Sequence, residues 1–217
     1  MTVEHSKDHV NARRAYNSNR RRQQSQETHN AVLDAAEAKF FAHGYSTTTI
    51  DSIAAEATVS TATLYKSYGS KAGLLRALCQ RALGGRGPVP AEERSDTLQF
   101  NEPDPRKIIA GWGRLSAEVA PRIAPLMLLL RDAAGGDPRA AALLKELDDD
   151  RYARMTHNAR SLVDGGHTRP EIDLSGASDV LWTYSSHELY DLLVHRRKWT
   201  VDNYSTFIAT AMTQALL

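Results

Sequence analysis

The segment from Thr61 to Lys66 holds the side chains best suited to do chemistry in this sequence. Thr61, Thr63, Tyr65 and Lys66 each donate hydrogen bonds or carry a positive charge, and no acidic residue lies among them. Hydroxyl and amine groups of this kind donate to phosphate oxygens and to the edges of bases. The segment therefore indicates contact with a nucleic acid.

Two short helices joined by a tight turn would position these side chains, over about residues 49–68. The first helix is predicted from the i, i+3, i+4, i+7 spacing of its apolar residues, which are Ile50, Ile53, Ala54 and Ala57. Thr48 is its expected N-cap, with Asp51 three residues later as in a capping box. Ser60 is the expected N-cap of the second helix, which carries Leu64 inward. The pattern is that of a helix-turn-helix.

A further helix is predicted on each side of this motif. The preceding helix begins near Ser25, carries an apolar stripe and ends at Gly44, while the following one spans about residues 71–83 and ends at Gly84 and Gly85. Residues 1–24 are polar and are expected to lack regular structure. Two interpretations of this segment remain open: a solvated tail, or a basic arm that reaches DNA through the arginines at 20–22.

This order of residues resembles the DNA-binding domain of the TetR family of one-component transcriptional regulators. The resemblance covers about residues 25–85. It rests on Ala36, Phe40, Gly44, Tyr45, Thr48 or Thr49, Ile53, Ala54, Val59, Ser60, Thr63, Leu64, Tyr65, Ser70, Lys71, Leu74 and Leu75. Four positions depart from the family pattern: Thr58 and Ala62 replace small residues, usually glycine, Tyr68 replaces phenylalanine, and Gly73 replaces a glutamate. A branched residue at 58 puts strain in the turn, and the departures together would lower the stability of the domain.

The resemblance implies a role for individual residues in binding double-stranded, palindromic operator DNA. It implies phosphate contacts for Thr48, Tyr65 and Lys71. It places Thr61, Ala62, Thr63 and Lys66 of the recognition helix toward the major groove, and Ser60 at the cap of this helix is included in the expected DNA-binding set. Tyr68 is expected to pack in the small core instead.

The remaining sequence predicts helices and no strand, so the expected fold class is all-α. We expect an N-terminal three-helix domain that contains the helix-turn-helix, followed by a linker at about residues 86–105 that is rich in proline, glycine and charged residues. A C-terminal helical domain for effector binding and dimerisation is expected at 106–217, which gives about nine helices in all. The expected C-terminal segments are 105–119, 121–134, 138–164, 174–195 and a last helix after Thr200.

The C-terminal domain supplies candidates for an effector pocket and for a dimer interface. The pocket candidates, each of which could equally be plain core, are Trp112, Leu126, Met127, Leu130, Tyr152, Met155 and Tyr184. They would suit a small apolar or aromatic effector. Candidates for a homodimer interface on the last two helices are Leu181, Leu189, Leu192, Phe207 and Met212. Dimerisation would set two recognition helices one DNA turn apart, as a palindrome requires.

Other classes of function find less support in the 217 residues. His187, Asp191 and His195 lie at i, i+4 and i+8, a spacing that can hold a metal but more often forms a polar face, and no metal or other cofactor is expected. Cys79 is the only cysteine and is interpreted as a small buried hydrophobe. No catalytic motif and no long apolar run is found, so we expect neither an enzyme nor a membrane protein, and a cytoplasmic location.

These observations together predict a ligand-responsive, homodimeric regulator of transcription, most simply a repressor that a small-molecule effector releases from its operator. The alternative is a constitutive helix-turn-helix protein that binds DNA or a partner and has no effector. An apolar cavity in the C-terminal domain would distinguish the two.

Overall fold

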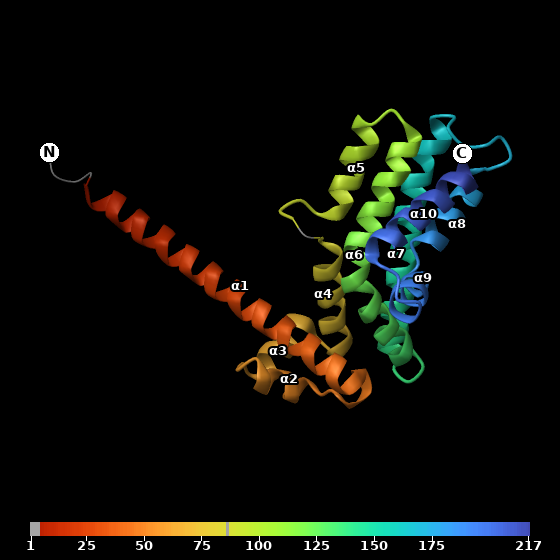
Figure 1. Cartoon of the computed structure of the whole chain (residues 1–217). Coiled ribbons are helices and arrows are strands. Elements are labelled where there is room, and N and C mark those ends of the chain that lie inside the picture. The colour runs from red at the N-terminus through yellow and green to blue at the C-terminus, as the bar shows by residue number, and fades with distance from the viewer. Residues whose placement is uncertain (1–4, 86) are drawn as a thin grey trace. The chain divides into compact units, whose positions relative to one another are not determined.

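The computed structural model describes residues 5–85 and 87–217, with side chains from Arg20 onward apart from that gap. Over these residues the chain is helical and contains no strand, as predicted (Figure 1). It divides into two compact units, Met1–Leu74 and Leu75–Leu217. Each unit is described on its own below.

The N-terminal unit holds the helix-turn-helix. It consists of α1 (His5–Thr47), α2 (Ile50–Glu56), α3 (Thr61–Tyr68) and the first residues of α4 (Lys71–Leu83). Its core is formed by side chains that are at most 2% exposed, among them Phe40, Ile53, Leu64 and Leu74. The predicted positions of the two short helices and of the buried Leu64 are confirmed.

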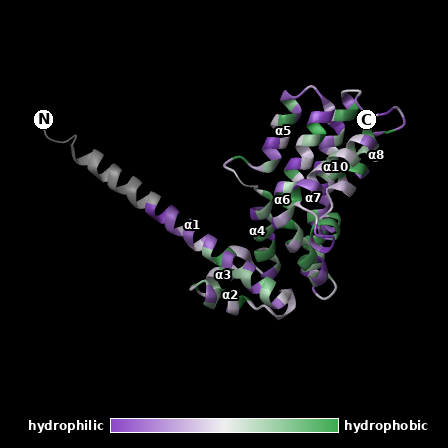
Figure 2. Ribbon diagram, in the orientation of Figure 1, coloured by the Kyte–Doolittle hydropathy of each residue, from purple (hydrophilic) through white to green (hydrophobic). Residues whose placement is uncertain are grey.

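Helix α1 begins at His5, further toward the N-terminus than the expected start at Ser25. Side chains 20–27 are exposed, and Figure 2 shows this stretch of α1 as hydrophilic. Because each residue added to an existing helix gains a backbone hydrogen bond without the cost of nucleation, a polar segment can extend a helix whose distal part is packed. The expectation that residues 5–24 lack regular structure was therefore wrong.

Gly44 interrupts α1 near its end, with φ 79° and ψ 165°. This is a region of backbone conformation that is essentially restricted to glycine. The predicted break at Gly44 is thus confirmed. Gly85, with φ 84°, follows the end of α4 at Leu83 as predicted.

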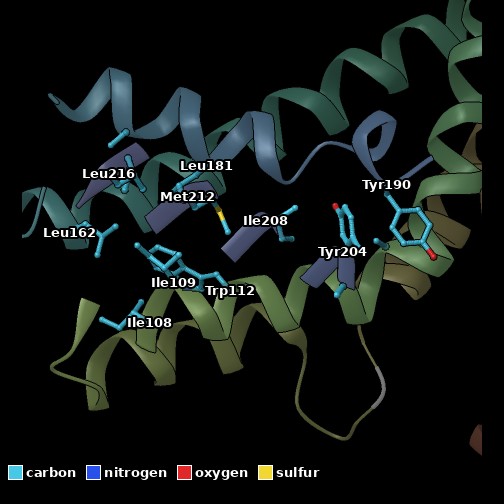
Figure 3. Close-up of a cluster of buried hydrophobic side chains, with 14 of the residues drawn as sticks. Ile108, Ile109, Trp112, Leu162, Leu181, Tyr190, Tyr204, Ile208, Met212 and Leu216 are labelled. Atoms are coloured by element: carbon cyan, nitrogen blue, oxygen red, sulfur yellow. The ribbon is translucent and has the colours of Figure 1, made fainter. Parts of the chain in front are cut away.

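The C-terminal unit is built around α6. Its helices after α4 are α5 (Ala91–Asn101), α6 (Pro105–Ala134), α7 (Pro138–Asp164), α8 (Leu174–Tyr184), α9 (His187–Tyr190), the π-helical segment η1 (Asp191–Arg196) and α10 (Val201–Leu216). Helix α6 packs against α5, α7, α9 and α10. The buried cluster between them includes Ile109 and Trp112 of α6, Leu181 of α8, and Tyr204 and Met212 of α10 (Figure 3).

Polar caps set the starts of the principal C-terminal helices. Asp104, Asp137, Asp173 and Thr200 each accept a hydrogen bond from a backbone N–H in the first turn of α6, α7, α8 and α10, respectively. Such caps satisfy a donor that would otherwise lack a partner. The predicted boundaries of α7 and the predicted start of α10 are confirmed.

Two predicted boundaries in and before α6 were wrong. Residues 121–134 do not form a separate helix, because α6 continues through Pro121 and Pro125. Each proline removes one helical hydrogen bond, at about 3 kcal/mol in a helix interior. The buried side chains of Ala117, Ala120 and Ile123 on the same helix offset this cost. The expected linker also contains α5, whose Leu98 side chain packs where Gly111 of α6 has no side chain.

The predicted helix over 174–195 is broken at two adjacent serines. Helix α8 ends at Tyr184, and Ser186 caps α9 by accepting a hydrogen bond from the N–H of Leu189 at 3.3 Å. Serine side chains compete for backbone groups and so favour caps over helix interiors. In the part of the chain that the structure describes, no helix has the length and apolar character needed to cross a membrane.

Candidate DNA-binding site and ligand cavity

The start of α2 is fixed by a capping box, but Thr49 forms it rather than Thr48. The Thr49 hydroxyl accepts from the Ser52 N–H at 3.1 Å, and the Ser52 hydroxyl in turn accepts from the Thr49 N–H at 3.3 Å. Thr48 is 3% exposed, and its hydroxyl lies 2.8 Å from the carbonyl oxygen of Gly44 and 3.1 Å from that of Lys39. The predictions that Thr48 caps α2 and that its side chain contacts a phosphate were therefore wrong, because its hydroxyl is turned into the protein.

The turn between α2 and α3 contains the strained residue that the sequence predicted. Thr58 has φ 55°, in the left-handed region that β-branched residues rarely occupy. Ser60 follows as the N-cap of α3 and accepts from the Thr63 N–H at 3.1 Å, which confirms that prediction. The Thr61 hydroxyl donates to the Asp51 carboxylate at 2.6 Å and so links α3 to α2. Thr61 thus serves the joint between the helices instead of facing freely outward.

The exposed face of α3 carries Ala62, Thr63, Tyr65 and Lys66. Tyr65 is 54% exposed, so burial does not explain this aromatic ring. Lys66 presents its ammonium group on the same short helix, and no acidic residue lies on α3. Hydroxyl donors, a small residue and a cation on one convex face fit the floor of a DNA groove and the phosphates at its edges.

Lys71 holds the loop before α2 from the first residue of α4. Its ammonium donates to the carbonyl oxygens of Tyr45 at 2.6 Å, Thr48 at 3.0 Å and Ser46 at 3.3 Å, and lies 4.2 Å from the centre of the Tyr45 ring. An ammonium group has three N–H donors, and three carbonyl oxygens match them. The structure thus assigns Lys71 to positioning α2, in place of the phosphate contact that the resemblance implied.

Two of the unusual residues fit the junction of α3 and α4. Tyr68 stacks on His29 of α1 with ring centres 5.9 Å apart, and its hydroxyl lies 2.8 Å from the His29 Nδ1. A Cβ atom on Gly73 would come within 1.9 Å of the Tyr68 carbonyl oxygen. The glutamate usual in the family cannot fit this geometry, so Gly73 supports a tight junction here. The prediction that the departures lower the stability of the domain therefore does not hold for Gly73.

The C-terminal unit contains a cavity of about 950 Å³ that is partly open to solvent. Its apolar wall includes Trp112, Ile123, Met127, Leu181 and Met212, which come from α6, α8 and α10. Much of this wall belongs to the buried cluster shown in Figure 3. A cavity of this size and lining is typical of a site for a small organic molecule.

Buried or half-buried polar side chains also line the cavity, and the sequence did not single them out as ligand contacts. They are Arg151, His187 and Tyr204. Burial, with a smaller contribution from the charges of Arg151 and Arg131, lowers the pKa of His187 to about 3, so its ring is neutral at pH 7. Burial also lowers the pKa of Arg151, which the Asp148 carboxylate opposes. No periodic pattern reveals such residues, because they come from different helices.

Ion pairs surround the exposed side of the cavity. Arg154 of α7 pairs with Asp96 of α5 at 2.6 Å, and Arg76 of α4 pairs with Glu146 of α7. Each of the four lines the cavity. The Arg154 contact lowers the pKa of Asp96, so this carboxylate stays ionised at neutral pH. Asp96 and Glu146 are therefore each matched by an arginine, and the Arg154 contact joins α5 to α7.

Comparison with protein families decides the nature of the N-terminal unit. Residues 32–78 match the model of the bacterial regulatory proteins of the tetR family. This segment belongs to the TetR family. The matched segment contains α2, α3 and the Lys71 contact described above. The model describes bacterial regulatory proteins, and the segment that it matches includes the exposed face of α3.

Solved structures extend the likeness of fold to the C-terminal unit. NalD of Pseudomonas aeruginosa, the secondary repressor of the MexAB-OprM multidrug efflux pump, has 19% identity and a TM-score of 0.70, over 89% of this chain and 98% of that one. The fatty acid degradation regulator FadR of Bacillus halodurans has 16% identity and a TM-score of 0.69, over 86% and 94%. SmeT, in complex with triclosan, has 21% identity and a TM-score of 0.67, over 88% of this chain and 91% of that one. A comparison with curated protein sequences found no match.

Three of the seven predicted pocket residues line the cavity: Trp112, Met127 and Met155. The other four do not. Leu126 and Leu130 are buried elsewhere in α6, while the Tyr152 hydroxyl donates to Asp179 and Tyr184 packs edge-on against Phe207. Helical spacing identified a buried face of α6, but could not separate the part that borders an open volume from the part in close packing.

The predicted dimer residues also separate by exposure. Leu181 and Met212 are at most 3% exposed and belong to the core of their own chain, so an interface role for these two was wrong. Leu192 is 49% exposed and Phe207 is 38% exposed, whereas Leu189 is partly buried against the core. The exposed apolar side chains on η1 and α10 are thus the predicted residues that their own chain leaves uncovered.

The remaining polar candidates form no shared site among the described residues. His187 is buried, whereas the Asp191 carboxylate pairs with Arg196 at 2.7 Å and with His195 at 3.2 Å. Asp191 and His195 thus remain in contact within η1, whereas the buried His187 does not join them. No group of three potential metal ligands occurs in the described chain. Cys79 is fully buried, and burial raises the pKa of its thiol to about 12, which confirms its interpretation as a buried hydrophobe.

Proposed function

We propose that this TetR-family chain is a homodimeric repressor that binds a palindromic operator and is released from it by a small apolar or aromatic effector. The observation that carries the proposal is the presence, in one chain, of an exposed recognition face on α3 and a cavity of about 950 Å³ in the other unit. The first serves DNA binding, and the second would make that binding responsive to a ligand.

Helix α4 offers a covalent route between the two activities. Its first residue, Lys71, holds the carbonyl groups that precede α2, while Arg76, Gln80 and Leu83 further along the same helix line the cavity. A ligand that favours one position of α4 would thereby favour one arrangement of the two recognition helices in a dimer. Repression is then lost by a shift of population toward a form that no longer matches half-sites one DNA turn apart.

The alternative, a constitutive helix-turn-helix protein without an effector, is less well supported. Such a protein has no need of a large, partly open cavity with buried polar groups in its wall. A protein with a similar fold, SmeT, is found in complex with triclosan. We therefore favour the ligand-responsive function over the constitutive one.

Footprinting of the DNA upstream of the chain's own gene tests the DNA-binding part. We expect a protected palindrome, from which Tyr65→Ala lowers affinity about tenfold and reduces the dependence on salt. Thr63→Ala or Lys66→Ala would change the preferred sequence if these side chains reach bases. Arg139→Ala, an exposed change on α7, is the matched control and should leave affinity unchanged. Full affinity in Tyr65→Ala would contradict the assigned recognition face.

A reporter placed behind that promoter tests repression and release. Deleting the gene should raise transcription, and a compound that fills the cavity should raise it only when the gene is present. Lower transcription after deletion would identify an activator instead. If no apolar compound that binds the purified chain changes operator affinity, the constitutive alternative would stand.

A further inference from the structure

Three side chains that line the cavity place hydrogen-bonding groups in its least exposed part. Tyr204 of α10 is 1% exposed and His187 of α9 is 8% exposed. Neither side chain makes a hydrogen bond to another described residue. Arg151 of α7 lies close enough for its charge to act on both. An unpartnered polar group in such a place carries a cost that a bound ligand would remove.

Arg151 retains donors after its protein contacts are made. Its Nη1 donates to the Trp182 carbonyl oxygen at 2.6 Å and to the Ser185 hydroxyl at 3.2 Å, and its guanidinium lies 4.5 Å from the centre of the Trp182 ring. Its Nη2 is 3.8 Å from the Asp148 carboxylate, beyond hydrogen-bond distance, and its Nε has no partner. The guanidinium is therefore oriented by the protein but not neutralised at close range.

The other groups at this end favour an oxygen acceptor. The Tyr204 hydroxyl and one ring nitrogen of the neutral His187 can each donate, and the Trp112 Nε1 is a further buried donor without a partner. The carboxylates around the cavity lie at its exposed side, where Arg76 and Arg154 pair with Glu146 and Asp96. The buried end thus combines a cation and several donors with the apolar wall described above.

We propose that this cavity takes an apolar ligand that carries an oxyanion, such as a carboxylate or a sulfonate, with the oxyanion held by Arg151 and Tyr204 beside His187. This inference names the chemical class of the effector and so rests on the proposed function. Arginine pairs with oxyanions through parallel N–H donors, and the pairing is strong where water is excluded. A cationic ligand would meet Arg151, and a purely apolar one would leave the donors unsatisfied.

Two fluorescent probes with the same apolar body test the proposal on the full chain. They are 8-anilinonaphthalene-1-sulfonate, which carries the oxyanion, and N-phenyl-1-naphthylamine, which lacks it. We expect Arg151→Met to weaken sulfonate binding about tenfold or more and Tyr204→Phe about threefold, while binding of the neutral probe changes less than about twofold. The matched controls are Arg160→Met on the exposed face of α7 and Tyr184→Phe, which does not line the cavity.

Equal weakening of both probes by Arg151→Met, or no saturable binding of the sulfonate by the wild-type chain, would overturn the proposal. If Arg151→Met does not fold, Tyr204→Phe decides, because it removes one oxygen and preserves the ring. Operator affinity is measured separately with each probe. Sulfonate binding that depends on Arg151 but does not release DNA would refute the effector function alone. Release of DNA by the neutral probe only would refute the oxyanion and leave the effector function standing.

Discussion

Two partly buried cations, one in each unit, show how differently the units use their polar groups. The Lys71 ammonium is matched by three carbonyl oxygens within 3.3 Å. The Arg151 guanidinium is fixed by two acceptors and a ring, yet its Nε has no partner and its nearest carboxylate is 3.8 Å away. The first cation completes a structure. The second has donors that a ligand could use.

This difference indicates where each unit interacts with something else. In the N-terminal unit the polar groups near the core serve caps and turns, and the groups left for a partner are on the surface of α3. In the C-terminal unit the groups left for a partner are inside. A rigid exposed face suits DNA, whose phosphates and base edges are reached from outside, whereas a buried set of donors suits a small molecule that can be enclosed.

The largest expected effect is that of Lys71→Met on the stability of the N-terminal unit. Loss of a charged donor to three carbonyl oxygens should lower the free energy of unfolding of this unit by about 2–3 kcal/mol. Hydrogen exchange of the α2 and α3 amides measures it, and those amides should lose protection. DNA binding should then fall because α2 is no longer held, not because a phosphate contact is missing.

Lys66→Met is the matched control, because Lys66 is an exposed lysine on α3. Its effect on the same amides should stay within about 0.5 kcal/mol, as for most surface changes. If Lys71→Met kept full protection and only weakened DNA binding, the phosphate role would be restored and the contrast with Arg151 would disappear.

A smaller effect is expected from pH in the C-terminal unit. The pKa of His187 is about 3 in the folded chain, against about 6.5 for an exposed histidine, so the unfolded state binds the proton more readily. Stability is therefore full above pH 6.5 and falls as the pH drops toward 3, by about 2 kcal/mol at pH 5 from this residue. Urea unfolding followed by tryptophan fluorescence measures it, since Trp112, Trp182 and Trp199 all lie in this unit.

His187→Gln keeps a polar side chain and cannot take up the proton. The variant should lose that part of the pH dependence between pH 7 and pH 5. An unchanged dependence in His187→Gln would mean that His187 is accessible to protons in the folded state. The buried donor set of the C-terminal unit would then be less isolated from water than its exposure indicates.

The two units also differ in how far their sequence predicts them. In the N-terminal unit the cap at Ser60, the break at Gly44 and the burial of Leu64 were predicted, because each depends on residues within one helical turn. The errors there concern side-chain direction. Thr48 and Lys71 have the right chemistry for phosphate, but contacts with residues up to 26 positions away turn them inward.

In the C-terminal unit the sequence predicted helices but not their joints or the site. Pro121 read as the start of a helix, although burial on both sides carries α6 through it. Arg151, His187 and Tyr204 meet only because α7, α9 and α10 pack around one volume. That arrangement depends on tertiary contacts between distant segments, which leave no periodic signal in the sequence.

The smallest expected effect concerns backbone strain. Among the described residues, each unit has one non-glycine residue with positive φ, which is Thr58 in the N-terminal unit and Lys198 in the C-terminal unit. Thr58→Gly should raise the stability of the N-terminal unit by about 1 kcal/mol, because glycine adopts φ 55° without the steric cost of a β-branched side chain. The neighbouring change Ala57→Gly is the matched control. Ala57 has φ −78°, so this change should lower stability by roughly 0.5–1 kcal/mol through the greater freedom of glycine when unfolded. Protection of the α2 and α3 amides measures both. If the two changes lowered stability alike, Thr58 would not be strained, and the turn would be as well satisfied as the Lys71 contact that holds α2 from its other end.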